Sequence, residues 1–156
     1  MDKFSAHGGI SALLIGISTL LAIHLAGSSL WIGLLAGLLL LPRDEGGFAA
    51  RSSRLLRAAA LAMPVTLASG WALAFLANGP PALWPRAVDA MQAAGIVMAV
   101  AILLAVFGVA PMLREAEISR DRDITRNETR RLVRLIAIDL LLGLVILGFA
   151  VIGRYG

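Results

Sequence analysis

The stretch "LLIGISTLLAIHLAGSSLWIGLLAGLLLLPR", residues 13–43, contains a single ionisable side chain, His24, before its closing Pro42 and Arg43. A bilayer has a hydrocarbon core of about 30 Å, which about 20 helical residues can cross. The apolar part of this stretch is longer than that. The sequence therefore predicts a membrane-spanning helix over 13–41, with a histidine at membrane depth.

Three further segments have the length and apolar composition of membrane spans, namely 58–77, 87–112 and 133–152. Residues that stop or start helices separate them: "NGPP" follows the second span, and "LWPR" precedes the third, with its proline suited to a helix start. We therefore expect an all-α membrane protein, a four-transmembrane-helix bundle that forms one domain over residues 1–156.

The composition supports a membrane protein and limits its chemistry. Of the 156 residues, 59% are hydrophobic and 15% are charged, whereas a soluble domain carries about 25% charged residues. The chain has no cysteine, which excludes disulfides, iron-sulfur clusters and thiolate metal sites. The net charge is +4, but the basic residues lie beside apolar segments without interleaved aromatics. We expect the bilayer and its anionic headgroups, rather than nucleic acid, as their partners.

The basic residues also predict an orientation. Eleven of the fourteen lysines and arginines lie in the loops that follow the first and third spans. Cytoplasmic loops retain such charge, so both loops should face the cytoplasm and both termini the periplasm. The second of these loops, "LREAEISRDRDITRNETRR" (113–131), alternates acids with arginines. We expect it to form a solvated helical extension or a hairpin.

One face of the first helix is small and polar. At 3.6 residues per turn, His24, Ser28 and Trp31 lie on the same side. Farther along, Gly33 and Gly37 form a small-xxx-small pair that permits close approach of another helix. These two patterns predict that the first helix packs inside the bundle with His24 pointing inward.

Two ionisable side chains stand out at membrane depth, His24 and Asp139, and such residues suggest a function by default. Their estimated axial separation is roughly 10 Å, so a direct pair is not expected. His24 suits haem ligation, copper ligation or proton transfer. The structural alternative is a neutral imidazole bonded to a serine or a backbone carbonyl of a neighbouring helix. For Asp139, the alternative is a protonated carboxyl bonded to a neighbour.

A metal at His24 needs further ligands. Thr66 and Met98 lie at a similar depth to His24, and Met91 and Gln92 lie nearer the outer mouth. Methionine together with histidine suits copper(I), and the same pair also occurs on haem. Packing is the alternative role for a methionine in an apolar helix.

Several stretches resemble the copper resistance D (CopD-like) integral membrane domain family. They are "HLAGSSLWIG" (24–33), "VTLASGWALAF" (65–75) and "RRLVRLIAIDLLLGLVILGFAVIG" (130–153), which are similar to its first, second and last helices. The resemblance covers most of the chain. It implies a bacterial inner-membrane protein that binds or passes copper, with His24 as a ligand and Met98 and Met91 as soft partners.

A more distant resemblance is to the HemJ-like protoporphyrinogen oxidase family, which shares the His-x6-Trp spacing and the "LLLLPR" helix end (38–43). It implies haem b on His24, with Ser28 beside the ring and Trp31 packed against it. The third span has neither lysine nor histidine and departs from both families. We lean against an enzyme, because no nucleophile, paired carboxylates or nucleotide loop is present.

A third hypothesis belongs to a different class of protein. A small membrane chain with few polar core residues can act as an accessory structural subunit of a larger complex, or as a homodimer. Its contact surfaces would be "GLLAG" (33–37), Gly143 and Gly148. The sequence leaves three hypotheses open: copper protein, haem protein and structural subunit.

Overall fold

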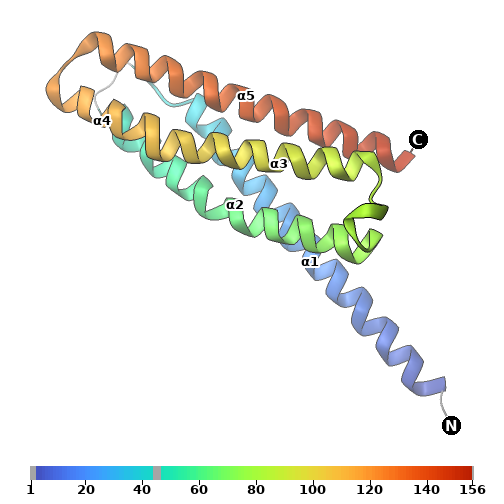
Figure 1. Ribbon diagram of the computed structural model, residues 1–156. Helices are drawn as coiled ribbons and strands as arrows, with labels where there is room; N and C mark the ends of the chain where they lie inside the picture. The colour runs from blue at the N-terminus through green and yellow to red at the C-terminus, as the bar shows by residue number, and fades with distance from the viewer. Residues whose placement is uncertain (1–2, 44–46, 156) are drawn as a thin grey trace.

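The structure is a computed structural model that describes residues 3–43 and 47–155, with side chains for 14–43 and 47–148. The described chain is all-helical and contains no strand (Figure 1). Its elements are α1 (Lys3–Leu39), α2 (Phe48–Asn78), the 3-10 turn η1 (Pro81–Leu83), α3 (Arg86–Leu104), the π-helical segment η2 (Ala105–Val109), α4 (Ala110–Ser119) and α5 (Arg122–Tyr155).

The helices form four rods, because α3, η2 and α4 follow one another without a break. α2, the α3–α4 rod and α5 run alongside each other, whereas the N-terminal part of α1 extends away from them (Figure 1). α1 packs mainly on α2 and also contacts α5. The N-terminal half of α1 and the C-terminal half of α5 diverge (Figure 1).

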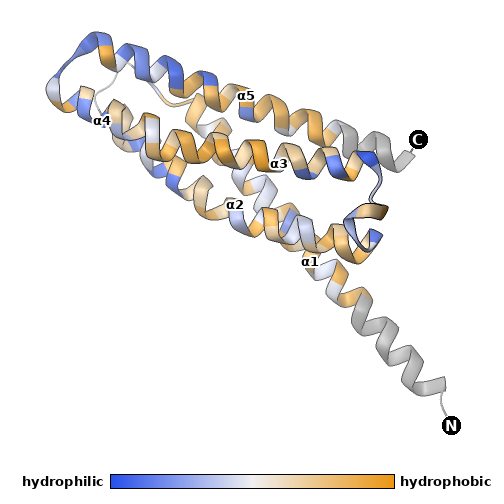
Figure 2. Ribbon diagram, in the orientation of Figure 1, coloured by the Kyte–Doolittle hydropathy of each residue, from blue (hydrophilic) through white to orange (hydrophobic). Residues whose placement is uncertain are grey.

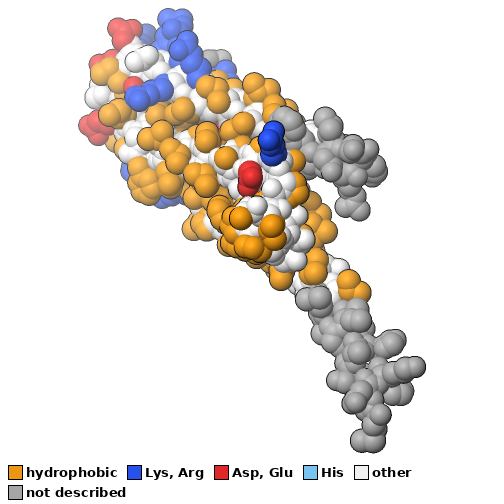
Figure 3. Space-filling model, turned by 45° about the vertical axis from the view of Figure 1, so that its right-hand side comes forward, with side chains coloured by type: hydrophobic (Ala, Val, Ile, Leu, Met, Phe, Trp, Pro, Cys, Tyr) orange, Lys and Arg blue, Asp and Glu red, His pale blue; other side chains and the backbone are white. Residues whose placement is uncertain are grey.

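Three described helical segments are long and apolar enough to cross a membrane: Leu14–Leu39, Phe48–Asn78 and Arg86–Ser119. The fourth predicted span, 133–152, lies within α5, and its last four residues are outside the described side chains. Hydrophobic residues cover the middle of the rods, and charged residues gather at the end formed by α4 and the start of α5 (Figures 2 and 3). We call this the arginine-rich end.

The helices extend beyond most of the predicted boundaries. α1 begins at Lys3 rather than at 13, α2 at Phe48 rather than at 58, and α5 at Arg122 rather than at 133. The predicted bounds followed apolar length, but polar turns continue a helix into water. At the start of α2, the backbone N–H of Ala49 donates to Glu117 Oε1 at 2.9 Å, which supplies an acceptor that the helix itself lacks.

The polar loop 113–131 is a helical hairpin, as the sequence predicts. α4 ends at Arg120, whose φ of 57° lies in the left-handed region. Asp121 Oδ1 then accepts the N–H groups of Asp123 and Ile124 at 3.1 and 3.0 Å. This side-chain cap starts α5 at once, so the two rods are antiparallel neighbours.

The π-helical segment η2 directly precedes Pro111. A proline inside a helix has no N–H, and its ring crowds the carbonyl four residues earlier, here that of Phe107. The wider turn ends with a bond from the N–H of Ala110 to the carbonyl of Ala105. The rod accommodates the proline in this way.

The packed core lies toward the arginine-rich end. Its fully buried side chains come from all four rods: Leu35, Leu38, Leu56, Ile102, Leu113, Leu132 and Ile136. These residues are large and apolar, and they hold the rods together at this end. The opposite half of the bundle contains a cavity instead.

The small-xxx-small pair makes no close helix contact within the described part of the chain. A Cβ added to Gly33 or Gly37 would meet nothing within 4 Å, so no described helix packs closely there. The prediction that this pair seats α1 in the bundle is wrong. α1 instead approaches α2 through Gly27, where an added Cβ would lie 2.7 Å from Thr66 Oγ1.

Candidate functional site

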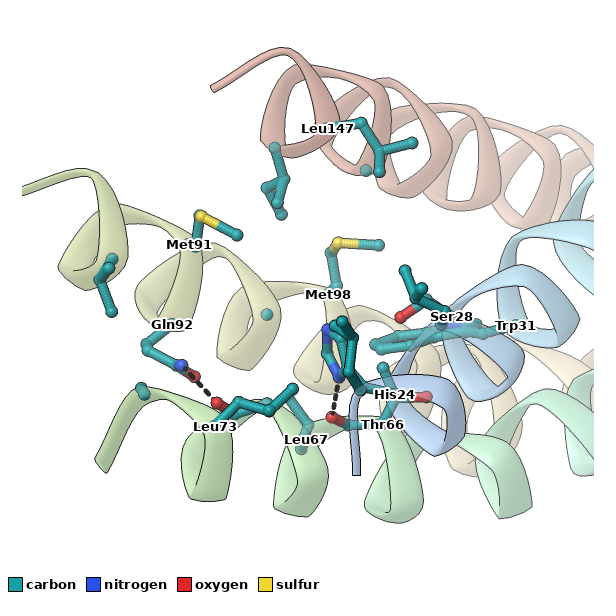
Figure 4. A pocket seen from close by; sticks show the side chains of 18 of the residues that line it. His24, Ser28, Trp31, Thr66, Leu67, Leu73, Met91, Gln92, Met98 and Leu147 are labelled. Atoms are coloured by element: carbon teal, nitrogen blue, oxygen red, sulfur yellow. Dashed lines mark hydrogen bonds between the residues drawn. The ribbon is translucent and has the colours of Figure 1, made fainter. Parts of the chain in front are cut away.

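A cavity of about 430 Å³ lies between α1, α2, α3 and the last part of α5 (Figure 4). Its walls are mainly apolar, and His24, Ser28, Thr66, Asn78 and Gln92 add polar groups. This volume falls in the range of about 300–1,000 Å³ that is typical of small-ligand sites. The cavity is therefore the candidate site of the molecule.

The cavity brings together seven of the residues that the sequence singles out. They are His24, Ser28 and Trp31 of α1, Thr66 of α2, and Met91, Gln92 and Met98 of α3. The expected inward direction of His24 is thereby confirmed. Whether these residues bind a metal or a cofactor stays a prediction.

The His24 imidazole is anchored through one nitrogen. Its Nδ1 lies 3.0 Å from the carbonyl oxygen of Thr66 and 3.2 Å from Ser69 Oγ. A carbonyl only accepts, so Nδ1 bears the proton and donates. The Ser69 hydroxyl is itself committed as a donor, to the carbonyl of Val65 at 2.7 Å. The hydrogen bond to a backbone carbonyl of a neighbouring helix, expected for a structural His24, is thus present at Nδ1.

The second nitrogen of His24, Nε2, is unprotonated and has a lone pair that can bind a ligand. A neutral imidazole protonated at Nδ1 carries its acceptor at Nε2, and Nε2 makes no hydrogen bond within the described chain. It points away from Thr66, on the side where the Met98 thioether lies (Figure 4). An imidazole whose Nδ1–H is bonded to a backbone carbonyl is the usual form of a metal-ligating histidine.

Two positions next to Thr66 shape this arrangement. Ser69 supplies the second acceptor for Nδ1. At Gly70, an added Cβ would lie 2.9 Å from His24 Cε1, so only glycine leaves room for the ring. The sequence predicts Thr66 at the depth of His24 but gives no role to Gly70 or Ser69. The signal was the i, i+3, i+4 spacing of "TLASG", which places all three on one helix face.

Gln92 and the two methionines form the α3 side of the cavity. Gln92 Nε2 donates to the carbonyl of Gly70 at 3.3 Å and so ties α3 to α2 beside the histidine. In the view of Figure 4, Met98 lies above the imidazole, and Met91 lies nearer the start of α3. Thr66 contributes its carbonyl, because its hydroxyl donates to the carbonyl of Ala62 at 3.1 Å.

Asp139 does not belong to this cavity. It is 2% exposed, and both its carboxyl oxygens lack a hydrogen-bond partner in the part of the chain that the structure describes. The expectation of no direct pair with His24 is confirmed. The alternative of a carboxyl bonded to a neighbour is wrong for the described chain, since neither carboxyl oxygen has a hydrogen-bond partner there.

The donors around the cavity are uncharged. Among the described side chains, no group of three or more His, Cys, Asp or Glu residues could hold a metal ion. The metal-binding atoms that the lining offers are one imidazole nitrogen, of His24, and two thioether sulfurs, of Met91 and Met98. Such a set suits a soft ion of low charge, or a cofactor that needs one axial ligand.

The comparisons with known proteins found no matching family model, curated protein or solved structure.

Proposed function

We propose that this protein is a multi-pass protein of a bacterial inner membrane, in which the four rods form a transmembrane bundle. Three described rods have the required length and apolar composition. The arginine-rich end lies in the cytoplasm and both termini lie in the periplasm, because eleven of the fourteen basic residues flank the two cytoplasmic turns.

We further propose that the protein binds or passes copper(I), as the resemblance to the CopD-like family suggests. The observation that supports this best is the anchored His24, whose Nδ1–H is bonded to Thr66 and whose Nε2 has no hydrogen-bond partner among the described residues, in a cavity that Met98 also lines. Imidazole and thioether ligands select copper(I). A neutral ligand set also favours a monovalent ion, because burying net charge at membrane depth is costly.

The two methionines supply the first test. Replacing Met91 and Met98 together with leucine keeps the volume but removes both sulfurs. We expect the copper(I) affinity to fall by more than about 100-fold, since even an outer-shell partner is worth 10–100-fold. Competition with a chromogenic copper(I) chelator measures this affinity. Met63→Leu is the control, because Met63 is buried outside the cavity lining; an equal loss in both variants contradicts the assignment.

Gly70 supplies a second test, directed at the orientation of the ring. In Gly70→Ala, the new methyl group overlaps the position of His24 Cε1, so the imidazole must turn away from the Thr66 carbonyl. We expect copper(I) affinity to fall by about tenfold, with helical content unchanged in circular dichroism. Gly33→Ala, where the added methyl meets no atom, should bind as the wild type does. Unchanged binding in Gly70→Ala argues against an anchored ligand.

A second candidate function is haem b binding, which the size of the cavity favours. A volume of about 430 Å³ exceeds what one ion needs. Three leucines of the cavity lining are also exposed on the surface of the molecule. They are Leu21, Leu25 and Leu147, with 45, 55 and 48% of their area exposed. The site therefore opens toward lipid between α1 and α5.

In this candidate, His24 would hold the haem iron through Nε2, and Ser28 and Trp31 would pack against the bound haem. Bound haem would supply one-electron transfer. The protein's own part is to orient the ligand through Thr66 and to exclude water with the apolar wall. An absorption spectrum separates the candidates, because only haem gives a Soret band.

A further inference from the structure

A groove of about 360 Å³ lies on the surface near the arginine-rich end, between α2 and the η2–α4 part of the third rod. Arg57, Arg114 and Glu115 are its charged residues. Leu56 and Val106 belong to its apolar lining. The groove is on the opposite half of the bundle from the His24 cavity and shares none of its residues.

The two arginines lie at the depth of lipid headgroups. Arg57 immediately precedes the apolar span 58–77, and Arg114 follows the end of the span 87–112 by two residues. The apolar surface adjoins the charged end of the molecule (Figures 2 and 3). One end of the groove therefore faces hydrocarbon, and the other faces the polar interface.

The side-chain arrangement fits such a boundary. Arg57 Nε donates to the carbonyl of Ser53, one turn nearer the polar end, at 3.2 Å. This is the direction in which a long basic side chain snorkels. Arg114 is exposed and, among the described residues, has no hydrogen bond or ion pair. Glu115 pairs with neither arginine in that same part of the chain, so the lining keeps a net positive charge.

We propose that this groove binds one anionic phospholipid. The lipid phosphate lies between Arg57 and Arg114, whose positive charges attract it. An acyl chain runs along Pro111 and Val106, which line the groove and are at least partly exposed, toward the membrane interior. Basic pockets between transmembrane helices on the cytoplasmic side recognise headgroups in this way. The site is independent of any metal or haem at His24.

Thermal unfolding in detergent tests this site, with phosphatidylglycerol, phosphatidylcholine of the same chains, or inorganic phosphate added in turn. We expect phosphatidylglycerol alone to raise the Tm of the wild type. Each arginine near a surface contributes about fivefold to anionic-lipid binding, so Arg57→Gln with Arg114→Gln should need about thirtyfold more lipid for the same shift. The charge-retaining pair Arg57→Lys and Arg114→Lys should keep most of the effect.

Arg122→Gln with Arg126→Gln is the matched control, because both arginines are exposed on α5 outside the groove. This control should respond to phosphatidylglycerol as the wild type does. An equal weakening in both double variants would mean diffuse attraction to the arginine-rich end and would overturn the proposal. An equal shift with phosphatidylcholine or with inorganic phosphate would also overturn it. If the glutamine pair fails to fold, the lysine pair decides: loss of the shift there rejects the site.

Discussion

A His24→Ala variant should purify without copper, whereas the wild type loaded with copper(I) should retain it near one ion per chain. The methyl group offers no lone pair, and among the described side chains no other imidazole lines the cavity. Elemental analysis after removal of free metal measures the difference. Among the single substitutions in the cavity this is the largest expected effect, because the remaining donors are thioethers alone.

His24→Asn separates ligand loss from structural damage. Its amide Nδ2 takes the position of the Nδ1 atom that lies 3.0 Å from the Thr66 carbonyl oxygen, so the contact between α1 and α2 is kept. The variant should have wild-type helical content and still lack copper. Stoichiometric copper in both His24 variants would remove the histidine from the site.

Asp139→Leu should stabilise the fold, which is the second large effect. The carboxyl is buried, and neither oxygen has a partner in the described chain. An unpaired buried polar group costs about 1–3 kcal/mol, so an apolar side chain should raise the free energy of unfolding by about 2 kcal/mol. For a chain of this size, that corresponds to roughly 4–8 °C in Tm. Thermal unfolding in detergent provides the measurement.

Ile136→Ala is the comparison for Asp139→Leu. Ile136 is 1% exposed and lies in the same core, and removing its side chain should cost about 2–5 kcal/mol. The two variants should therefore shift the Tm in opposite directions. A lower Tm for Asp139→Leu would show that the fold depends on the carboxyl, and it would restore the idea of a hydrogen-bonded Asp139.

Much of the architecture could be predicted from the sequence because a membrane helix is specified by length and apolarity. The run around His24 and the proline-marked turns predict the number and order of the rods. The helix ends were missed because polar turns such as those at 48–57 and 122–132 remain helical in water. Apolarity does not mark where they begin.

The composition of the site was predicted better than its geometry. Periodicity places His24, Ser28 and Trp31 on one face, and the estimated depths place Thr66 and Met98 level with them, as the cavity lining shows. The sequence could not identify Thr66 as the residue whose carbonyl accepts the hydrogen bond from Nδ1, since every residue has a carbonyl.

Two other features depend on how each helix is rotated about its own axis, and one sequence alone does not predict that rotation. They are the direction in which Gly33 and Gly37 face and the lack of a partner for Asp139. The pair Gly33 and Gly37 has the spacing of a helix contact, but it faces away from the other described helices. The unused pair remains a surface that another membrane subunit or a second copy can approach, as the hypothesis of a structural subunit requires. Asp139 was placed at membrane depth, but its lack of a partner follows from packing.

The central claim is that His24, anchored through Nδ1, presents Nε2 to a ligand in the cavity. The most direct measurement combines an absorption spectrum and metal analysis on one purified sample of the wild type and of His24→Ala. The copper account predicts copper near one ion per chain in the wild type, no Soret band, and loss of the metal in the variant. A Soret band that disappears with His24 would support haem b instead. Absence of both copper and haem after loading with each would contradict the claim.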